Sequence, residues 1–98
     1  MFVNIIKSYR DIVAVCDSEL IGKKFEQDKF LLDVKEGFFK GEETSEEKTI
    51  EIMKHMAKED ATFNIIGKKS IDAALKAGII SEEGVSEIQG IRFAMILM

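Results

Sequence analysis

Two apolar runs near the start of the chain, residues 2–7 and 12–16, are rich in β-branched side chains and flank a polar tetrad. This pattern predicts a β-hairpin with a short loop. The second run is apolar at every position, so we expect it to be a central strand that is covered on both faces. Residues 30–34 show the alternation of a third, half-buried strand. The two phenylalanines between the glycines of segment 37–41 are predicted to lie in a loop that folds over the edge of the core.

A helix is predicted from residue 45 to residue 58. Thr44 and Glu47 have the capping-box spacing that opens a helix, and the acidic residues at its start suit the positive end of the helix dipole. At 3.6 residues per turn, the apolar side chains share one face and His55 lies nearly opposite. We therefore expect the only histidine of the chain to be exposed, without the convergent partners that a catalytic base or a metal ligand needs.

A second helix is predicted to begin at Gly67 and to end at Gly78. The apolar residues between these glycines again line one face, and a glycine is a common stop at the C-terminus of a helix. Residues 61–66, between the two helices, fit either a short strand or an early helical turn.

The end of the chain predicts a second hairpin, because residues 85–88 and 91–97 flank the two-residue connection Gln89-Gly90. The last strand is nearly all apolar, so we expect it to be docked in the core, with an exposed dimer edge as the alternative. Together these elements predict a single α+β domain over residues 1–98 in the order β-β-β-α-α-β-β, with two helices packed on a mainly antiparallel sheet.

The composition agrees with one globular domain: the chain has 98 residues, of which 46% are hydrophobic and 33% charged. Its apolar runs are much shorter than the roughly 20 residues of a membrane-spanning helix, so we expect no contact with a membrane. Charged residues interrupt the start of the chain, which argues against a signal peptide and predicts a cytoplasmic protein. Cys16 is the only cysteine, and we expect a small buried side chain rather than a reactive thiol.

The tetrapeptide Ile-Gly-Lys-Lys occurs twice, at residues 21–24 and 66–69. Each copy places a glycine, which can adopt backbone conformations closed to other residues, directly before two cations. The second copy should open a helix, where unpaired N–H groups and the helix dipole favour an anion. The candidate anion-binding residues are therefore Gly22, Lys23, Lys24, Gly67, Lys68 and Lys69. The same pattern also fits two glycine turns with solvated lysines.

Four segments taken as a set, residues 13–25, 64–67, 73–80 and 88–91, resemble an archaeal family known as domain of unknown function 424, over nearly the whole chain. The resemblance implies a small cytoplasmic archaeal protein and a loose association with translation genes. It implies no established activity and assigns no catalytic residue.

Three functional hypotheses remain open from the sequence. The first is a nonenzymatic RNA- or translation-linked accessory module, in which the two Gly-Lys-Lys turns meet in space and bind the phosphate backbone of RNA or a ribonucleoprotein. The second is a protein-interaction or assembly factor whose acidic helix 45–58 binds a basic partner protein. The third is an enzyme of unrecognised type, since the chain has no common catalytic, cofactor-binding or metal-binding motif but does have 18 acidic residues.

The charge distribution bears on the first two hypotheses. Residues 36–60 contain eight acidic and four basic residues, so the whole net charge of −4 lies in this middle segment. No linear stretch is basic enough for a general nucleic-acid binder. Any basic patch must be assembled by folding.

Overall fold

The chain has more strands than its pattern predicts, although the predicted α+β class and the mainly antiparallel sheet are confirmed. The computed structural model describes residues 1–96. In chain order the elements are β1 (Phe2–Ile6), β2 (Ile12–Cys16), the 3₁₀ turn η1 (Ser18–Leu20), β3 (Lys24–Gln27), β4 (Phe30–Asp33), α1 (Glu36–Phe39), β5 (Glu42–Glu43), α2 (Glu46–Lys58), β6 (Thr62–Ile66), α3 (Lys68–Ala77), the 3₁₀ turn η2 (Glu82–Gly84), β7 (Ser86–Ile88) and β8 (Ile91–Ile96). Residue 97, the predicted end of the last strand, lies outside the described residues.

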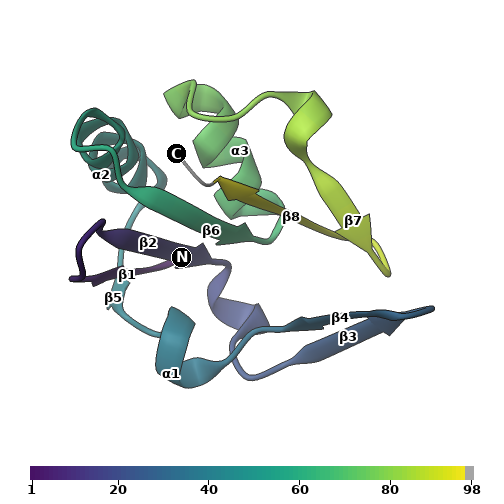
Figure 1. The fold of residues 1–98 in the computed structure, drawn as a ribbon. Helices are drawn as coiled ribbons and strands as arrows, with labels where there is room; N and C mark the ends of the chain where they lie inside the picture. The colour runs from purple at the N-terminus through teal and green to yellow at the C-terminus, as the bar shows by residue number, and fades with distance from the viewer. Residues whose placement is uncertain (97–98) are drawn as a thin grey trace.

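The segment between the two long helices, which fitted either a strand or a helical turn, is strand β6. It lies near the centre of a sheet with the order β5-β1-β2-β6-β8-β7, parallel to β2 and antiparallel to β8. Parallel neighbours need a long crossover connection, and the chain between β2 and β6 includes α2 (Figure 1). The predicted element order was therefore wrong at this point, because a strand separates the two long helices.

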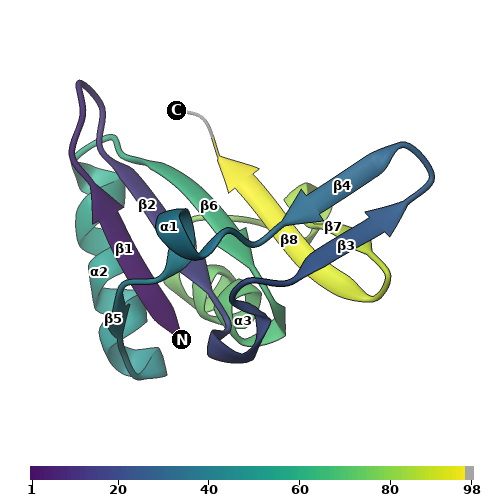
Figure 2. The same ribbon diagram turned by 90° about the horizontal axis from the view of Figure 1, so that it is seen from below.

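The two faces of the sheet are covered by different elements (Figures 1 and 2). Helices α2 and α3 pack on one face, where Met53 and Phe63 are fully buried. The other face is partly covered by η1, α1 and the β3–β4 hairpin, around a smaller cluster that includes Cys16 and Phe39. Strand β2 contributes side chains to both clusters. Its predicted central position and the predicted burial of Cys16 are confirmed.

Strands β3 and β4 form a separate two-stranded hairpin that extends away from the main sheet (Figure 2). The sequence predicted a half-buried strand at residues 30–34, but Phe30 and Leu31 are 70% and 55% exposed. The strand itself is confirmed, and Leu32 and Val34 pack into the smaller cluster as the alternation predicts, but Phe30 near the free end of the hairpin does not. Only Val34, just beyond the strand, is fully buried.

The free end of this hairpin is attached to the turn between β7 and β8. The Gln89 backbone N–H donates to the Gln27 side-chain oxygen at 3.0 Å, and the Gln89 carboxamide donates to the Glu26 carbonyl. Gln89 and Gly90 have φ angles of 50° and 78°, as a two-residue hairpin turn requires, so the predicted C-terminal hairpin is confirmed. The predicted burial of its last strand is wrong, because Ala94 is buried but Met95 is 65% exposed.

Capping residues and glycine stops in the sequence predicted the ends of α2 and α3 to within about one residue. Ser45 caps α2 by accepting a hydrogen bond from the Lys48 backbone N–H at 3.2 Å, so the cap lies one residue after the predicted Thr44. Gly78 ends α3 in the left-handed conformation, as predicted. The one-turn helix α1 overlaps segment 37–41, where a loop was predicted.

Candidate functional site

The first Gly-Lys-Lys copy forms an exposed turn between η1 and β3. Gly22 has a φ angle of 79°, and its N–H donates to the Val34 carbonyl at 2.7 Å. A Cβ atom added at Gly22 would meet nothing within 4 Å, so the glycine serves only the conformation of the turn.

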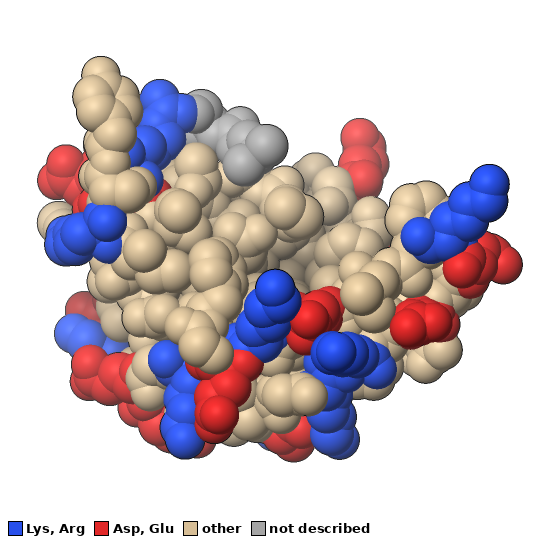
Figure 3. All heavy atoms as spheres, turned by 60° about the horizontal axis from the view of Figure 1, so that its bottom comes forward, with Lys and Arg blue, Asp and Glu red and all other residues tan. Residues whose placement is uncertain are grey.

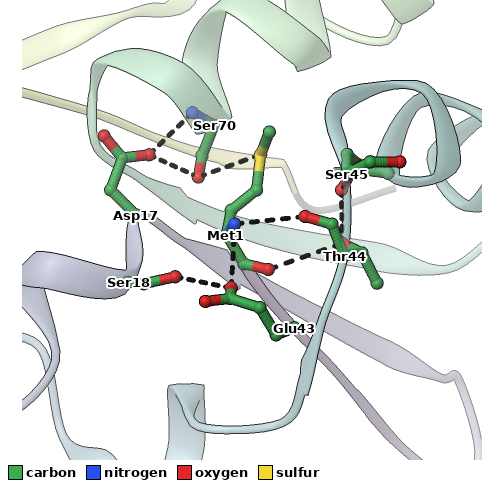
Figure 4. Close-up of polar contacts among 8 residues, drawn as sticks. Met1, Asp17, Ser18, Glu43, Thr44, Ser45 and Ser70 are labelled. Atoms are coloured by element: carbon green, nitrogen blue, oxygen red, sulfur yellow. Dashed lines mark hydrogen bonds and ion pairs between the residues drawn. The ribbon is translucent and has the colours of Figure 1, made fainter.

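The second copy opens α3 as predicted, but the N-terminus of this helix is already filled. The Asp17 carboxylate accepts hydrogen bonds from the backbone N–H groups of Lys69 at 3.1 Å and Ser70 at 2.8 Å, and from the Ser70 hydroxyl at 2.8 Å. Figure 4 shows the contacts with Ser70. A Cβ atom at Gly67 would lie 2.3 Å from the Asp17 Cγ, so only glycine permits this approach. The N–H groups that we expected to hold a phosphate therefore hold the protein's own carboxylate.

Asp17 lies directly before η1, in the position from which a side chain can cap that turn. Its side chain makes no capping hydrogen bond to η1 and reaches α3 instead. This contact joins residues 53 positions apart, so no local sequence signal could have predicted it.

A polar network continues from this cap to the edge strand β5 (Figure 4). Glu43 accepts a hydrogen bond from the Ser18 hydroxyl at 2.6 Å and forms an ion pair with the Met1 ammonium group at 3.0 Å. The hydrogen bond from Ser18, followed by that from Met1, holds the pKa of Glu43 below its ordinary value, and the charge of Lys69 acts in the same direction. Acidic groups therefore lie close to the second Gly-Lys-Lys copy.

Four exposed lysine side chains remain from the predicted anion site, and none of them forms an ion pair among residues 1–96. They are Lys23, Lys24, Lys68 and Lys69. Lys68 follows β6 after a single glycine, and Lys23 follows the parallel strand β2 after one short turn. Figure 3 shows basic and acidic side chains intermixed along the lower part of this view.

The predicted acidic helix has no net charge over its observed length. Between Glu46 and Lys58 it contains three glutamates and three lysines, and Glu46 pairs with Lys76 of α3 at 3.0 Å. The acidic excess of the middle segment lies before and after the helix. A basic partner of helix 45–58 would therefore contact mainly its flanking residues.

A charged hollow of about 550 Å³ lies between the β1–β2 loop and the C-terminal part of α2. His55 and Tyr9 line it, and both are exposed, as predicted for His55. Lys7 pairs with Asp11 at 3.2 Å at the same place. Across the described part of the chain, no group of three or more histidine, cysteine or acidic side chains is arranged to hold a metal ion. The lining has charges of both signs and favours no particular ligand.

An apolar groove of about 320 Å³ lies on the sheet face opposite α2 and α3. Strands β6 and β8 contribute to one side of it, and β4 and α1 to the other. Figure 3 shows a hollowed, uncharged region between the main body and the hairpin, with charged side chains around it. Its apolar lining residues are Leu31, Leu32, Phe38, Phe39, Ile65, Ile66, Phe93, Ala94 and Met95. Exposed apolar surface of this kind is typical of a binding site.

Asn64 is the polar side chain that β6 contributes to this groove. In the sheet register it lies between Ala14 of β2 and Met95 of β8. Its carboxamide makes no hydrogen bond with any described residue, whereas the carboxamide of Asn4 on β1 donates to the Phe38 carbonyl at 2.8 Å. A carboxamide offers donors and an acceptor, so Asn64 can orient a polar group of a ligand.

A sequence model of a family, described as "Protein of unknown function (DUF424)", matches residues 6–98. The chain belongs to the DUF424 family. The resemblance stated from the sequence is therefore confirmed. A search of curated proteins gives no match.

The fold of this DUF424 chain is similar to that in the crystal structure of an uncharacterized conserved protein from Methanopyrus kandleri. The TM-score is 0.84, the sequence identity is 19%, and the match covers 97% of this chain and 88% of the other. At this identity the likeness shows the fold alone. Among the described residues of the DUF424 chain, no helix has the length and hydrophobicity needed to cross a membrane.

Sequence reasoning missed the groove of this DUF424 chain. The one local signal was Asn64, a polar residue in an otherwise apolar run. The groove also depends on the separation of β4 from the main sheet, which the local pattern does not encode.

Proposed function

We propose that this DUF424 protein is a nonenzymatic interaction module that binds an apolar segment of a partner protein. The observation that carries the proposal is the groove beside β8, where apolar residues surround Asn64, whose carboxamide has no hydrogen-bond partner among residues 1–96. Transfer of the partner's apolar groups from water into the groove would lower the free energy of the complex, and Asn64 would orient the bound segment through a polar group. This role belongs to the class of interaction factors that the sequence left open, on a surface other than helix 45–58.

The chemistry of the groove supports binding better than catalysis. Its polar lining consists of Asp33, Lys35 and Asn64, without a histidine, cysteine or hydroxyl group that could form a nucleophile–base pair. The one thiol, Cys16, is fully buried elsewhere, and burial together with the charge of Asp17 raises its pKa to about 12. A thiol with this pKa is a poor nucleophile near neutral pH.

Site-specific photo-crosslinking tests the proposal. A benzophenone amino acid at position 95, in the groove, should form covalent adducts with a defined partner protein in extract of the organism that makes this chain. The same probe at position 48, on an exposed part of α2, is the matched control and should not give that adduct. Leu31→Asp places a charge in the groove, so it should weaken binding of the purified partner by at least about tenfold in calorimetry.

The proposal fails if the adducts are the same from positions 95 and 48. It also fails if Leu31→Asp leaves the affinity for the purified partner unchanged. Leu31 is 55% exposed, so the substitution should not prevent folding, and circular dichroism would verify this.

A second candidate, an RNA- or translation-linked accessory role, is favoured by the four exposed lysines of the Gly-Lys-Lys turns. Lys23→Glu combined with Lys68→Glu should weaken RNA binding by about 10- to 100-fold at low salt, because each lysine that contacts a phosphate releases counterions. The melting temperature should hardly change, since exposed charges contribute little to stability. Fluorescence anisotropy with labelled RNA at two salt concentrations checks this expectation. Equal affinities of parent and variant, or binding that ignores salt, would leave the lysines as solvated surface.

A further inference from the structure

Strand β8 is longer than its outer neighbour β7, so part of its edge has no neighbouring strand. The β7 ladder covers β8 from Ile91 to Phe93, where Phe93 faces Ser86. On its other side, β8 pairs with β6 as far as Ile96. Among the described residues, the outer edge of β8 beyond Phe93 is therefore unpaired.

The hydrogen-bond pattern identifies the backbone groups on this open edge. The Gly67 N–H donates to the Arg92 carbonyl at 2.7 Å, so the main-chain groups of Arg92 face β6. In an antiparallel pair the residues alternate between facing their partner and facing away, so Ala94 also faces β6 and Met95 faces outward. The N–H and C=O groups of Met95 thus have no strand partner in the described part of the chain.

The open edge and the apolar groove belong to one surface. The Met95 side chain lines the groove and is 65% exposed, and Leu31 of β4 lines the same groove. A chain that paired with the Met95 backbone would therefore place alternate side chains against apolar lining.

The charged residues of the lining add an electrostatic preference. Asp33 faces Lys24 across the β3–β4 hairpin, which supplies it with an opposite charge nearby. Lys35 is exposed and forms no ion pair within residues 1–96. An acidic residue that flanks the apolar positions of the bound segment would complement Lys35.

We infer that the segment bound in the groove is an extended strand of a partner protein, which adds to the open edge of β8 through the main chain of Met95 and carries an acidic residue toward Lys35. This inference rests on the proposed function and specifies its ligand. Main-chain hydrogen bonds give such complexes much of their affinity, and the pockets for alternate side chains give the selectivity.

The test starts with a phage library of random linear dodecapeptides, selected for binding to the full chain. Peptides that also bind the Leu31→Asp variant are removed, because they bind outside the groove. The selected peptide, made synthetically, is then the probe. At saturation it should slow hydrogen exchange of the Met95 amide by at least about tenfold, while the amides of β1 stay unchanged. A version that is N-methylated at the positions facing β8 should bind at least about tenfold more weakly, because each lost hydrogen bond contributes on the order of a factor of ten.

The Lys35→Glu variant completes the test, since it should weaken binding of an acidic peptide and select peptides with a basic residue in its place. Strand addition is overturned, but the proposed function stands, if a peptide binds the groove without protecting Met95 and N-methylation has no effect. Both are overturned if no peptide distinguishes the parent from Leu31→Asp. Protection of Met95 that grows with protein concentration in the absence of peptide would assign the edge to a second copy and also overturn the inference.

Discussion

Asp17 occupies the place at the start of α3 that an external anion would need. The residue is only 5% exposed, and its carboxylate accepts two N–H groups of the first helical turn, which have no acceptor within the helix. Gly67 leaves the space for this carboxylate, and the two lysines that follow bring positive charge to the same end of the helix. The second Gly-Lys-Lys copy is therefore explained by folding, whereas the first is a solvent-exposed turn.

The repeated motif provides a matched pair of substitutions. Gly67→Ala should lower the free energy of unfolding by about 2 to 4 kcal/mol, because it combines a positive φ angle of 112° with a collision against Asp17. Gly22→Ala, at a φ angle of 79° with open space around the new methyl group, should cost only about 1 kcal/mol. Urea unfolding followed by circular dichroism measures both. Equal costs would show that Asp17 does not restrict position 67.

The buried thiol of Cys16 should make the stability of the protein depend on pH. Burial, followed by the charge of Asp17, raises the pKa of its thiol to about 12 in the folded protein, so the unfolded chain loses this proton first as the pH rises. The contribution of Cys16 to stability is therefore complete below the unfolded pKa of about 8.5 and declines as the pH rises toward the folded pKa. At pH 8, an aromatic disulfide reagent should react with the folded protein at least about 100-fold more slowly than with the urea-unfolded protein. Comparable rates would contradict the burial of this thiol.

The elements differ in how far local sequence determines them. Helices α2 and α3 were predicted within a residue or two, because caps, glycine stops and 3.6-residue periodicity all act within the helix itself. Strand β6 was ambiguous, since its central position comes from pairing with β2, about 50 residues earlier. The groove was not predictable either, because β4 alternates like a sheet strand yet pairs only with β3.

The amides of the β3–β4 hairpin should be less protected from hydrogen exchange than those of the main sheet, because the hairpin lies outside that sheet. The contacts of Gln89 with Gln27 and Glu26 attach its free end. Gln27→Ala combined with Gln89→Asn removes both contacts and keeps a residue that tolerates the left-handed conformation at position 89. Amide exchange in β3 and β4 should accelerate by about tenfold, while β1 and β2 keep their protection. Hydrogen exchange read by NMR checks this, and uniform acceleration in all strands would contradict it.

The whole molecule presents two different surfaces. At the ends of the parallel strands β2 and β6, polar groups satisfy one another through Asp17, Ser70, Glu43 and Met1. The sheet face opposite the helices carries apolar lining, and within the described residues it has a carboxamide without a hydrogen-bond partner and a strand edge without a neighbour. The net charge of −4 does not oppose a ligand that binds mainly through apolar and main-chain contacts. This contrast is why the groove, rather than the Gly-Lys-Lys turns, is our first choice for the binding site.

The position of β2 between β1 and β6 also has a consequence for synthesis of the protein. A growing chain contains β2, which is apolar at every position, long before the ribosome has added β6 and α3. During that interval one edge of β2 lacks its neighbour, and Asp17 has no helix to cap. Unpaired apolar edges favour aggregation, so the nascent chain should be a better substrate for chaperones than the finished domain.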